Sequence, residues 1–211
     1  MAGAACYRAC MTSPSPRPIA AIRLDGGRLC LDFVNTIHDR FAAGPEDYLA
    51  TPERYVEWAR RTGALRSDED VAPPGSGEAR LMKDVRTLRD ALFRVLAASI
   101  DGHPLPADAL RVVNAWLLEA RKDQALGPDG QLVQSGPRGD ARRPLKCIAL
   151  DLVDTLEAAR AGRLKLKHCA NQTSCGWLFA DTTKNGKRRW CAMQTCGTLS
   201  KMATQRERSQ A

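Results

Sequence analysis

The stretch CANQTSCGWLFADTTKNGKRRWCAMQTCG, residues 169–197, holds four of the eight cysteines of this 211-residue chain. Cys169 and Cys175 form one close pair, and Cys191 and Cys196 form a second pair after fifteen intervening residues. Thiolates are good zinc ligands, and a closed set of four cysteines is typical of a structural rather than a catalytic site. The spacing therefore predicts one structural Zn²⁺ held by these four side chains, with unlinked core thiols as the alternative.

The residues between and after the two cysteine pairs predict a small finger. Residues 177–181 have the alternation of a strand, Asn185-Gly186 is a strong turn signal, and residues 187–190 return. We expect a β-hairpin there, followed by a helix that begins near residue 193 or 195 and ends near residue 208. Knuckle, hairpin and helix in this order have the layout of a treble-clef finger. A segment of this size has too small a core to be stable alone, which favours a metal.

The preceding part of the chain has the pattern of a helical domain. Thr51 is a good N-cap before Pro52 at the first helical position, and Gly63 is a suitable end for that helix. Apolar periodicity predicts the other elements, namely helices at 29–37, 78–99, 107–122 and 147–161 and a short strand at 132–133. We expect a mainly α (α+β) protein with a disordered extension at 1–18, a helical domain at 19–162 and the finger at 163–211.

Positive charge is concentrated in the predicted finger. The chain has a net charge of +8, and residues 163–211 contain ten basic and two acidic residues, so residues 1–162 are balanced. Four thiolates and one zinc ion leave the finger at about +6, which favours a polyanion such as DNA. The candidate DNA-contacting residues are Lys184, Lys187, Arg188, Arg189, Lys201, Arg206 and Arg208. The alternative is that these side chains only solvate the surface of a small domain.

Three polar residues interrupt an apolar segment of the helical domain and are candidates for ligand binding. Asp32, Asn35 and Thr36 lie in the predicted helix at 29–37. Buried polar groups need partners, and an unidentified small-molecule ligand is one interpretation. Internal capping of a neighbouring loop is the alternative. The aromatic residues of the finger, which are Trp177, Phe179 and Trp190, are interpreted as packing around the metal site rather than stacking on bases.

The hydropathy of the chain predicts where the protein is located, and the positions of the other cysteines predict their roles. No stretch approaches about 18 uncharged apolar residues, and the start of the chain lacks a secretory pattern, so we expect a cytoplasmic protein. Cys30 and Cys147 are interpreted as small buried hydrophobic residues, and Cys6 and Cys10 as incidental thiols. His168 precedes the first cysteine of the finger and is a weaker candidate ligand.

Two motifs resemble known bacterial domains. CGWLF at 175–179, KN at 184–185 and RRWC at 188–191 resemble the CGNR zinc finger. GRLCLDFVNT at 27–36 and YLATP at 48–52 are similar to the ABATE domain. Proteins with both modules are regarded as stress-induced transcription regulators. The resemblance implies a helix-rich domain that binds an unknown ligand and a treble-clef finger that binds DNA. In place of the family's Asn and Arg after the last Cys-Gly, this chain has Thr and Leu.

The combined interpretation is a DNA-binding transcription regulator with a ligand-sensing N-terminal domain. A zinc-dependent protein-interaction adaptor or an RNA-binding factor is the alternative, because the helix after the last cysteine is less basic than in the family. The sequence contains no nucleophile–base motif, no phosphate loop and no open zinc position, so we do not expect an enzyme. A homodimer is compatible with this interpretation because one small finger reads few base pairs.

Overall fold

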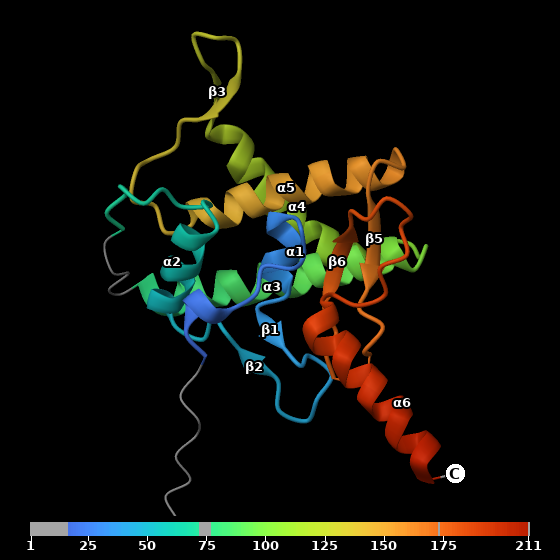
Figure 1. Ribbon diagram of the computed structural model, residues 1–211. Coiled ribbons are helices and arrows are strands. Elements are labelled where there is room, and N and C mark those ends of the chain that lie inside the picture. The colour runs from blue at the N-terminus through green and yellow to red at the C-terminus, as the bar shows by residue number, and fades with distance from the viewer. Residues whose placement is uncertain (1–16, 72–76, 173, 211) are drawn as a thin grey trace, which may run out of the picture.

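The computed structural model describes residues 17–71, 77–172 and 174–210 and confirms the mainly α fold class (Figure 1). Three long helices form most of the body: α3 (Glu78–Ile100), α4 (Ala107–Lys122) and α5 (Arg143–Arg160). Helix α4 packs against both α3 and α5, and the short helix α1 (Leu29–Val34) packs between α3 and α5. Within the described residues, no helix is long and apolar enough to cross a membrane.

Several helix bounds agree closely with the periodicity, because they depend on local signals. Helix α4 spans the predicted residues, and α3 extends one residue further than predicted. Helix α5 begins four residues earlier than predicted, because Pro144 suits a first helical turn. Helix α2 (Pro52–Arg61) begins after Thr51, whose hydroxyl oxygen accepts the backbone N–H of Arg54 at 3.5 Å. Gly63 follows it with a φ of 75°, where a residue without Cβ is favoured. A 3-10 turn, η1 (Ile19–Ala21), packs against α2.

The predicted helix at 29–37 is too long. Helix α1 ends at Val34, and Ile37 belongs to a strand, β1 (Ile37–His38), which pairs antiparallel with β2 (Glu46–Asp47). The Thr36 hydroxyl donates to the Phe33 carbonyl at 2.7 Å and its backbone N–H donates to the same oxygen. These local bonds end the helix, as side-chain hydroxyls often do at such positions.

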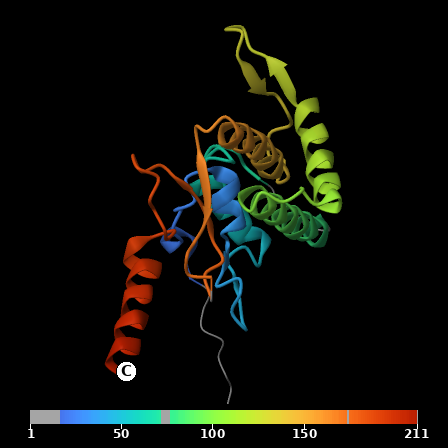
Figure 2. The same cartoon turned by 90° about the vertical axis from the view of Figure 1, so that its right-hand side faces the viewer.

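A second short hairpin extends from the body beyond α4 (Figures 1 and 2). It consists of β3 (Gln124–Leu126) and β4 (Leu132–Gln134), paired antiparallel with Leu126 opposite Leu132. The strand predicted at 132–133 is thereby confirmed. Most of the predicted extension, residues 1–16 with Cys6 and Cys10, and residues 72–76 before α3 lie outside the described residues.

The finger contains a hairpin, but not the predicted one. Strand β6 (Leu178–Asp181) pairs antiparallel with β5 (Lys165–His168), which precedes the first cysteine. Residues 187–190 are described and are not a strand, so the hairpin predicted from 177–181 and 187–190 is wrong. The turn predicted at Asn185-Gly186 is present, with a hydrogen bond from the Gly186 N–H to the Thr183 carbonyl. A π-helical turn, η3 (Met193–Gly197), leads into helix α6 (Thr198–Gln210), which confirms the start of the predicted helix.

The apolar core continues from the body into the finger. Phe33 and Trp58 of the body and Leu178 and Phe179 of β6 belong to one cluster of buried residues. The N–H of Ala180 also donates to the Gly26 carbonyl at 2.8 Å, which ties β6 to the segment before α1. Helix α6 extends away from this core, as Figure 2 shows at the lower left. The finger therefore docks on the body through β6 and leaves its last helix projecting.

Candidate metal centre

Four cysteine sulfurs converge where the finger meets the body. Cys169 directly follows β5, and Cys175 lies in the loop between β5 and β6. Cys191 precedes η3, and Cys196 lies within it. Their Sγ atoms lie within 4.8 Å of one another, with 3.7 Å between Cys175 and Cys191 and between Cys191 and Cys196. A tetrahedral zinc site with Zn–S bonds of about 2.3 Å places its sulfurs about 3.8 Å apart. Two sulfur pairs are thus at the separation of a zinc site, and all four sulfurs lie close enough together to share one ion.

The chemistry of this donor set fits one structural zinc ion. All four side chains are buried, and four protein sulfurs complete a tetrahedral shell without leaving a position for substrate. Two polar groups compensate thiolate charge: the Cys191 N–H lies 3.4 Å from the Cys169 Sγ, and the Asn171 side-chain amide lies 3.8 Å from the Cys196 Sγ. When bound, zinc supplies the cross-link that holds both halves of the finger.

Backbone contacts bring the first cysteine pair to the second. The Cys169 N–H donates to the Trp177 carbonyl at 2.8 Å, which continues the β5–β6 ladder past its end. The Ala170 N–H donates to the Arg189 carbonyl, also at 2.8 Å, and so holds the returning chain beside the first ligand. Gly176 has a φ of 64°, and a Cβ there would lie 3.0 Å from side-chain atoms of Arg40 and Phe41. Glycine is needed directly after the second ligand for both reasons.

A buried carboxylate replaces the strand pairing that the sequence predicted for residues 187–190. Asp181 accepts the Lys167 ammonium at 2.7 Å, the Thr183 N–H at 3.0 Å and the Arg188 N–H at 2.9 Å. Lys167 also donates to the carbonyls of Gly186 and Arg188, at 2.6 and 2.9 Å. Burial raises the pKa of Asp181, but these donors outweigh it and lower the pKa below its usual range. The loop between the cysteine pairs is therefore held by side chains.

Two comparisons with known protein families agree with this geometry. The ABATE family model, described as "Putative stress-induced transcription regulator", matches residues 27–159. The CGNR zinc finger model matches residues 165–209, which include all four cysteines. This chain belongs to the ABATE family. A comparison with curated proteins found no match. The resemblance to the ABATE domain and the CGNR finger is thus confirmed, as is the expected zinc centre.

Arg188 of this ABATE protein points into the finger, although its charge made it a candidate DNA contact. Its guanidinium donates to the carbonyls of Trp190 at 3.0 Å, Asp25 at 3.2 Å and Cys191, and it lies 4.5 Å from the centroid of the Phe179 ring. These contacts join the loop, the second cysteine pair and the segment before α1. We interpret Arg188 as a residue that positions the finger.

The other candidate DNA contacts lie on the outside of the finger. Lys184, Lys187 and Arg189 are exposed on the loop after β6, and Lys201 and Arg206 are exposed on α6. Arg208 lies within α6, but its side chain is outside the described part of the structure. In Figure 2 this loop and α6 lie on the same side of the molecule, away from α3 and α4.

The three candidate ligand-binding residues of the ABATE domain have partners within the chain. The Asn35 side chain donates to the Leu178 carbonyl at 2.8 Å and accepts the Leu178 N–H at 3.0 Å. The Thr36 hydroxyl accepts a hydrogen bond from Arg89 at 2.9 Å, and Asp32 accepts the Gly26 N–H at 2.8 Å. Burial raises the pKa of Asp32 to about 7. These contacts satisfy the polar groups without a ligand, so their ligand-binding role stays a prediction.

Some interpretations of single residues are also decided by the structure. His168 contacts Asp101 at 3.1 Å and is not part of the sulfur cluster. Cys30 is buried as predicted, whereas Cys147 is only partly buried. Trp177 and Phe179 are buried and Trp190 is half-buried against the same cluster, in agreement with their interpretation as core residues.

Sequence reasoning missed the arginine that links the body to the metal-binding segment. Arg23 donates to the Thr195 hydroxyl at 3.1 Å, between the last two cysteines, and pairs with Asp25 at 2.6 Å. Its partner Thr195 is 172 positions away in the chain. No local pattern marks such a contact, because neither residue interrupts an apolar stripe or is itself a predicted ligand.

Proposed function

We propose that this protein is a DNA-binding transcription regulator of the cytoplasm whose zinc finger contacts the phosphate backbone. The observation that carries the proposal is the exposure of Lys184, Lys187, Arg189, Lys201 and Arg206 on a finger attached to a body without net charge. Cations clustered at one end of a molecule attract a polyanion and orient it there. The proposal assigns no catalytic step to the protein.

The roles within the finger follow from its contacts. The sulfur cluster and Arg188 hold the loop and η3 together. The distances between the exposed cations of the loop and those of α6 are therefore fixed. A fixed spacing lets several cations contact successive phosphates at once, without ordering each side chain separately. The family's description as a transcription regulator supports this assignment.

Salt dependence of DNA binding tests the proposal. If four of the exposed cations contact phosphates, affinity falls about 100-fold between 50 and 200 mM salt. Fluorescence anisotropy with a labelled random duplex measures this directly. The Lys187→Gln/Arg189→Gln variant is expected to bind more weakly and with a shallower salt slope. A matched control, Lys83→Gln/Arg111→Gln, removes the same charge from exposed positions of the body and leaves binding unchanged. Absent or salt-independent binding by the wild type would refute the proposal.

A protein-interaction adaptor is the second candidate, and one observation favours it. Leu199 and Met202 of α6 are 58% and 48% exposed, and Met193 of η3 is 52% exposed. These apolar side chains lie on the projecting segment, where Leu199 occupies the position of the family's arginine. An exposed apolar stripe suits a protein partner better than a phosphate backbone. Under this candidate, Leu199→Gln abolishes partner capture while Lys187→Gln/Arg189→Gln does not.

A further inference from the structure

A cavity of about 240 Å³ lies between the body and the finger. Arg17, His38 and Tyr48 line it from the body, and Trp177, Thr195 and Leu199 line it from the finger. Three of the zinc-ligating cysteines also form part of one wall. Because the four sulfurs lie within 4.8 Å of one another, the metal fits inside their tetrahedron and leaves most of this cavity free. The cavity therefore has room for a small molecule besides the metal.

Three aromatic rings cluster at this cavity. The His38 and Tyr48 rings are stacked, with centroids 5.6 Å apart and planes at 16°. The Trp177 ring meets the His38 ring edge-on, at 6.1 Å and 72°. Small-molecule sites are commonly lined by aromatic rings that bury the apolar part of the ligand and by a few polar groups that orient it. These rings suit a flat apolar group.

The sign of the charge differs between the two sides of the cavity. The Arg17 guanidinium lies 5.8 Å from the Tyr48 ring centroid, and within the described residues it forms no ion pair. The His38 Nδ1 atom is buried and likewise has no hydrogen-bond partner in the described part of the chain. At the sulfur wall, zinc with four thiolates carries a net negative charge. Asp39, whose carboxylate lies 3.6 Å from the His38 Nε2 atom, also lines the cavity. The lining also contains Arg23, but that side chain is paired with Asp25 at 2.6 Å, so an acidic group is favoured at Arg17.

We propose that this cavity binds a small aromatic acid, with its ring against Tyr48 and His38 and its carboxylate at Arg17. The bound acid also contacts the finger, because Thr195 and Leu199 lie at the start of the segment that carries α6. Arg23 already links the body to Thr195, so the ligand acts where the two parts are joined. Binding thereby alters how α6 is presented to DNA; this coupling rests on the proposed function, whereas the binding itself does not.

Benzoate, benzyl alcohol and benzylamine test the proposal, because they share a ring and differ in charge. Ligand-observed NMR on the zinc-loaded full-length protein measures their dissociation constants. Benzoate has nine non-hydrogen atoms, so a dissociation constant of about 1 mM or tighter is expected. The neutral and cationic probes should bind about tenfold or more weakly.

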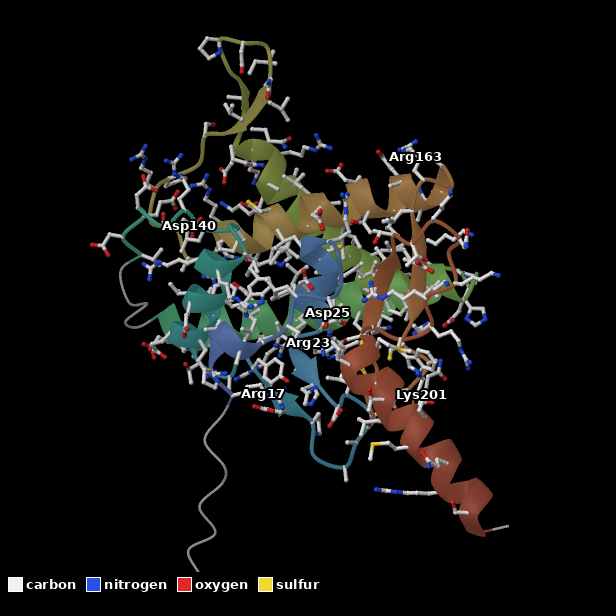
Figure 3. The ribbon with its side chains drawn as sticks, in the orientation of Figure 1. Arg17, Arg23, Asp25, Asp140, Arg163 and Lys201 are labelled. Carbon is white, nitrogen blue, oxygen red and sulfur yellow. The ribbon has the colours of Figure 1, made fainter. Side chains whose placement is uncertain are left out.

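Arg17→Gln and a matched control decide where the probe binds. The Arg17 side chain is exposed, so its replacement leaves the fold intact and weakens benzoate binding by about tenfold. Arg163→Gln removes an equal charge from an exposed position three residues after α5, far from Arg17 in Figure 3, and leaves benzoate binding unchanged. Equal or tighter binding of benzylamine, no detectable benzoate binding, or an unchanged benzoate affinity in Arg17→Gln would each overturn the proposal.

The coupling between ligand binding and DNA binding is measured separately, as the duplex affinity with and without benzoate. Saturating benzoate is expected to change the duplex affinity of the wild type at least threefold, about 0.7 kcal/mol, and Arg17→Gln should need about ten times more benzoate for the same change. If benzoate binds but duplex affinity does not respond, the coupling is refuted and the binding site stands. If the wild type does not bind duplex DNA, the proposed function fails, while the NMR result still decides the binding site.

Discussion

The clamp between Asn35 and Leu178 gives a sharp test of how the finger is held on the body. The Asn35 side chain satisfies both the N–H and the carbonyl of Leu178, and the two residues are 3% and 0% exposed. Asn35→Ala leaves both backbone groups buried and unpaired. A buried group that loses its partner costs about 1–3 kcal/mol, and some relaxation is expected, so we predict a loss of about 3 kcal/mol in unfolding free energy.

Urea unfolding of the zinc-loaded protein, followed by circular dichroism, measures this loss. The control is Asn114→Ala, the same substitution at an exposed position of α4, which is expected to change stability by no more than about 0.5 kcal/mol. Zinc transfer to a coloured chelator should also be faster in Asn35→Ala, because β6 is released from the body while the four cysteines are unchanged. A loss below about 1 kcal/mol, or equal chelator kinetics, would show that this clamp does not hold the finger.

Two further predictions concern charge. Arg188→Ala is expected to lower the melting temperature by several degrees, because about 2 kcal/mol of hydrogen bonding is lost. Arg189→Ala should instead lower duplex affinity and leave the melting temperature unchanged. If Arg189→Ala lowered the melting temperature and Arg188→Ala did not, the two assigned roles would be wrong. The pKa of Asp32 is raised to about 7, so the folded protein binds an extra proton between the unfolded pKa near 4 and pH 7. Stability should therefore fall as pH rises through this window, and Asp32→Asn should remove that fall; parallel stability curves for the two proteins would contradict the assignment.

The parts of the structure that depend on nearby residues could be predicted from the sequence. Helix α4 begins and ends as its apolar period indicated, and α2 begins at its Thr-Pro signal. The four ligands could be identified because metal sites of this class use short cysteine spacings. Their sulfurs come together as the pattern required.

The pairing of β6 could not be predicted in the same way. Its alternating residues and the Asn185-Gly186 turn favoured a hairpin with the segment that follows. Strand β5 precedes it instead, and the Asp181 carboxylate with the Lys167 ammonium holds the following segment. The turn forms, but the segment after it is held by this partly buried ion pair instead of pairing as a strand, and no sequence period marks such a pair.

The difference between Arg188 and Arg189 was also beyond sequence reasoning. The two residues are adjacent and identical in type, but Arg188 faces the carbonyls of the loop and Arg189 is exposed, with its guanidinium 5.0 Å from the Trp190 ring centroid. Charge counts treat them alike. Only the path of the backbone around the sulfur cluster determines that Arg188 points into the finger and Arg189 points to the solvent.

The zinc centre holds the finger together and thereby positions its charged surface. X-ray absorption at the zinc edge, together with elemental analysis of the full-length protein, tests it most directly. One zinc per chain with four sulfur neighbours at about 2.3 Å is predicted. A shell that contains nitrogen, or protein that is folded with no stoichiometric zinc, would contradict the assignment of Cys169, Cys175, Cys191 and Cys196 as its ligands.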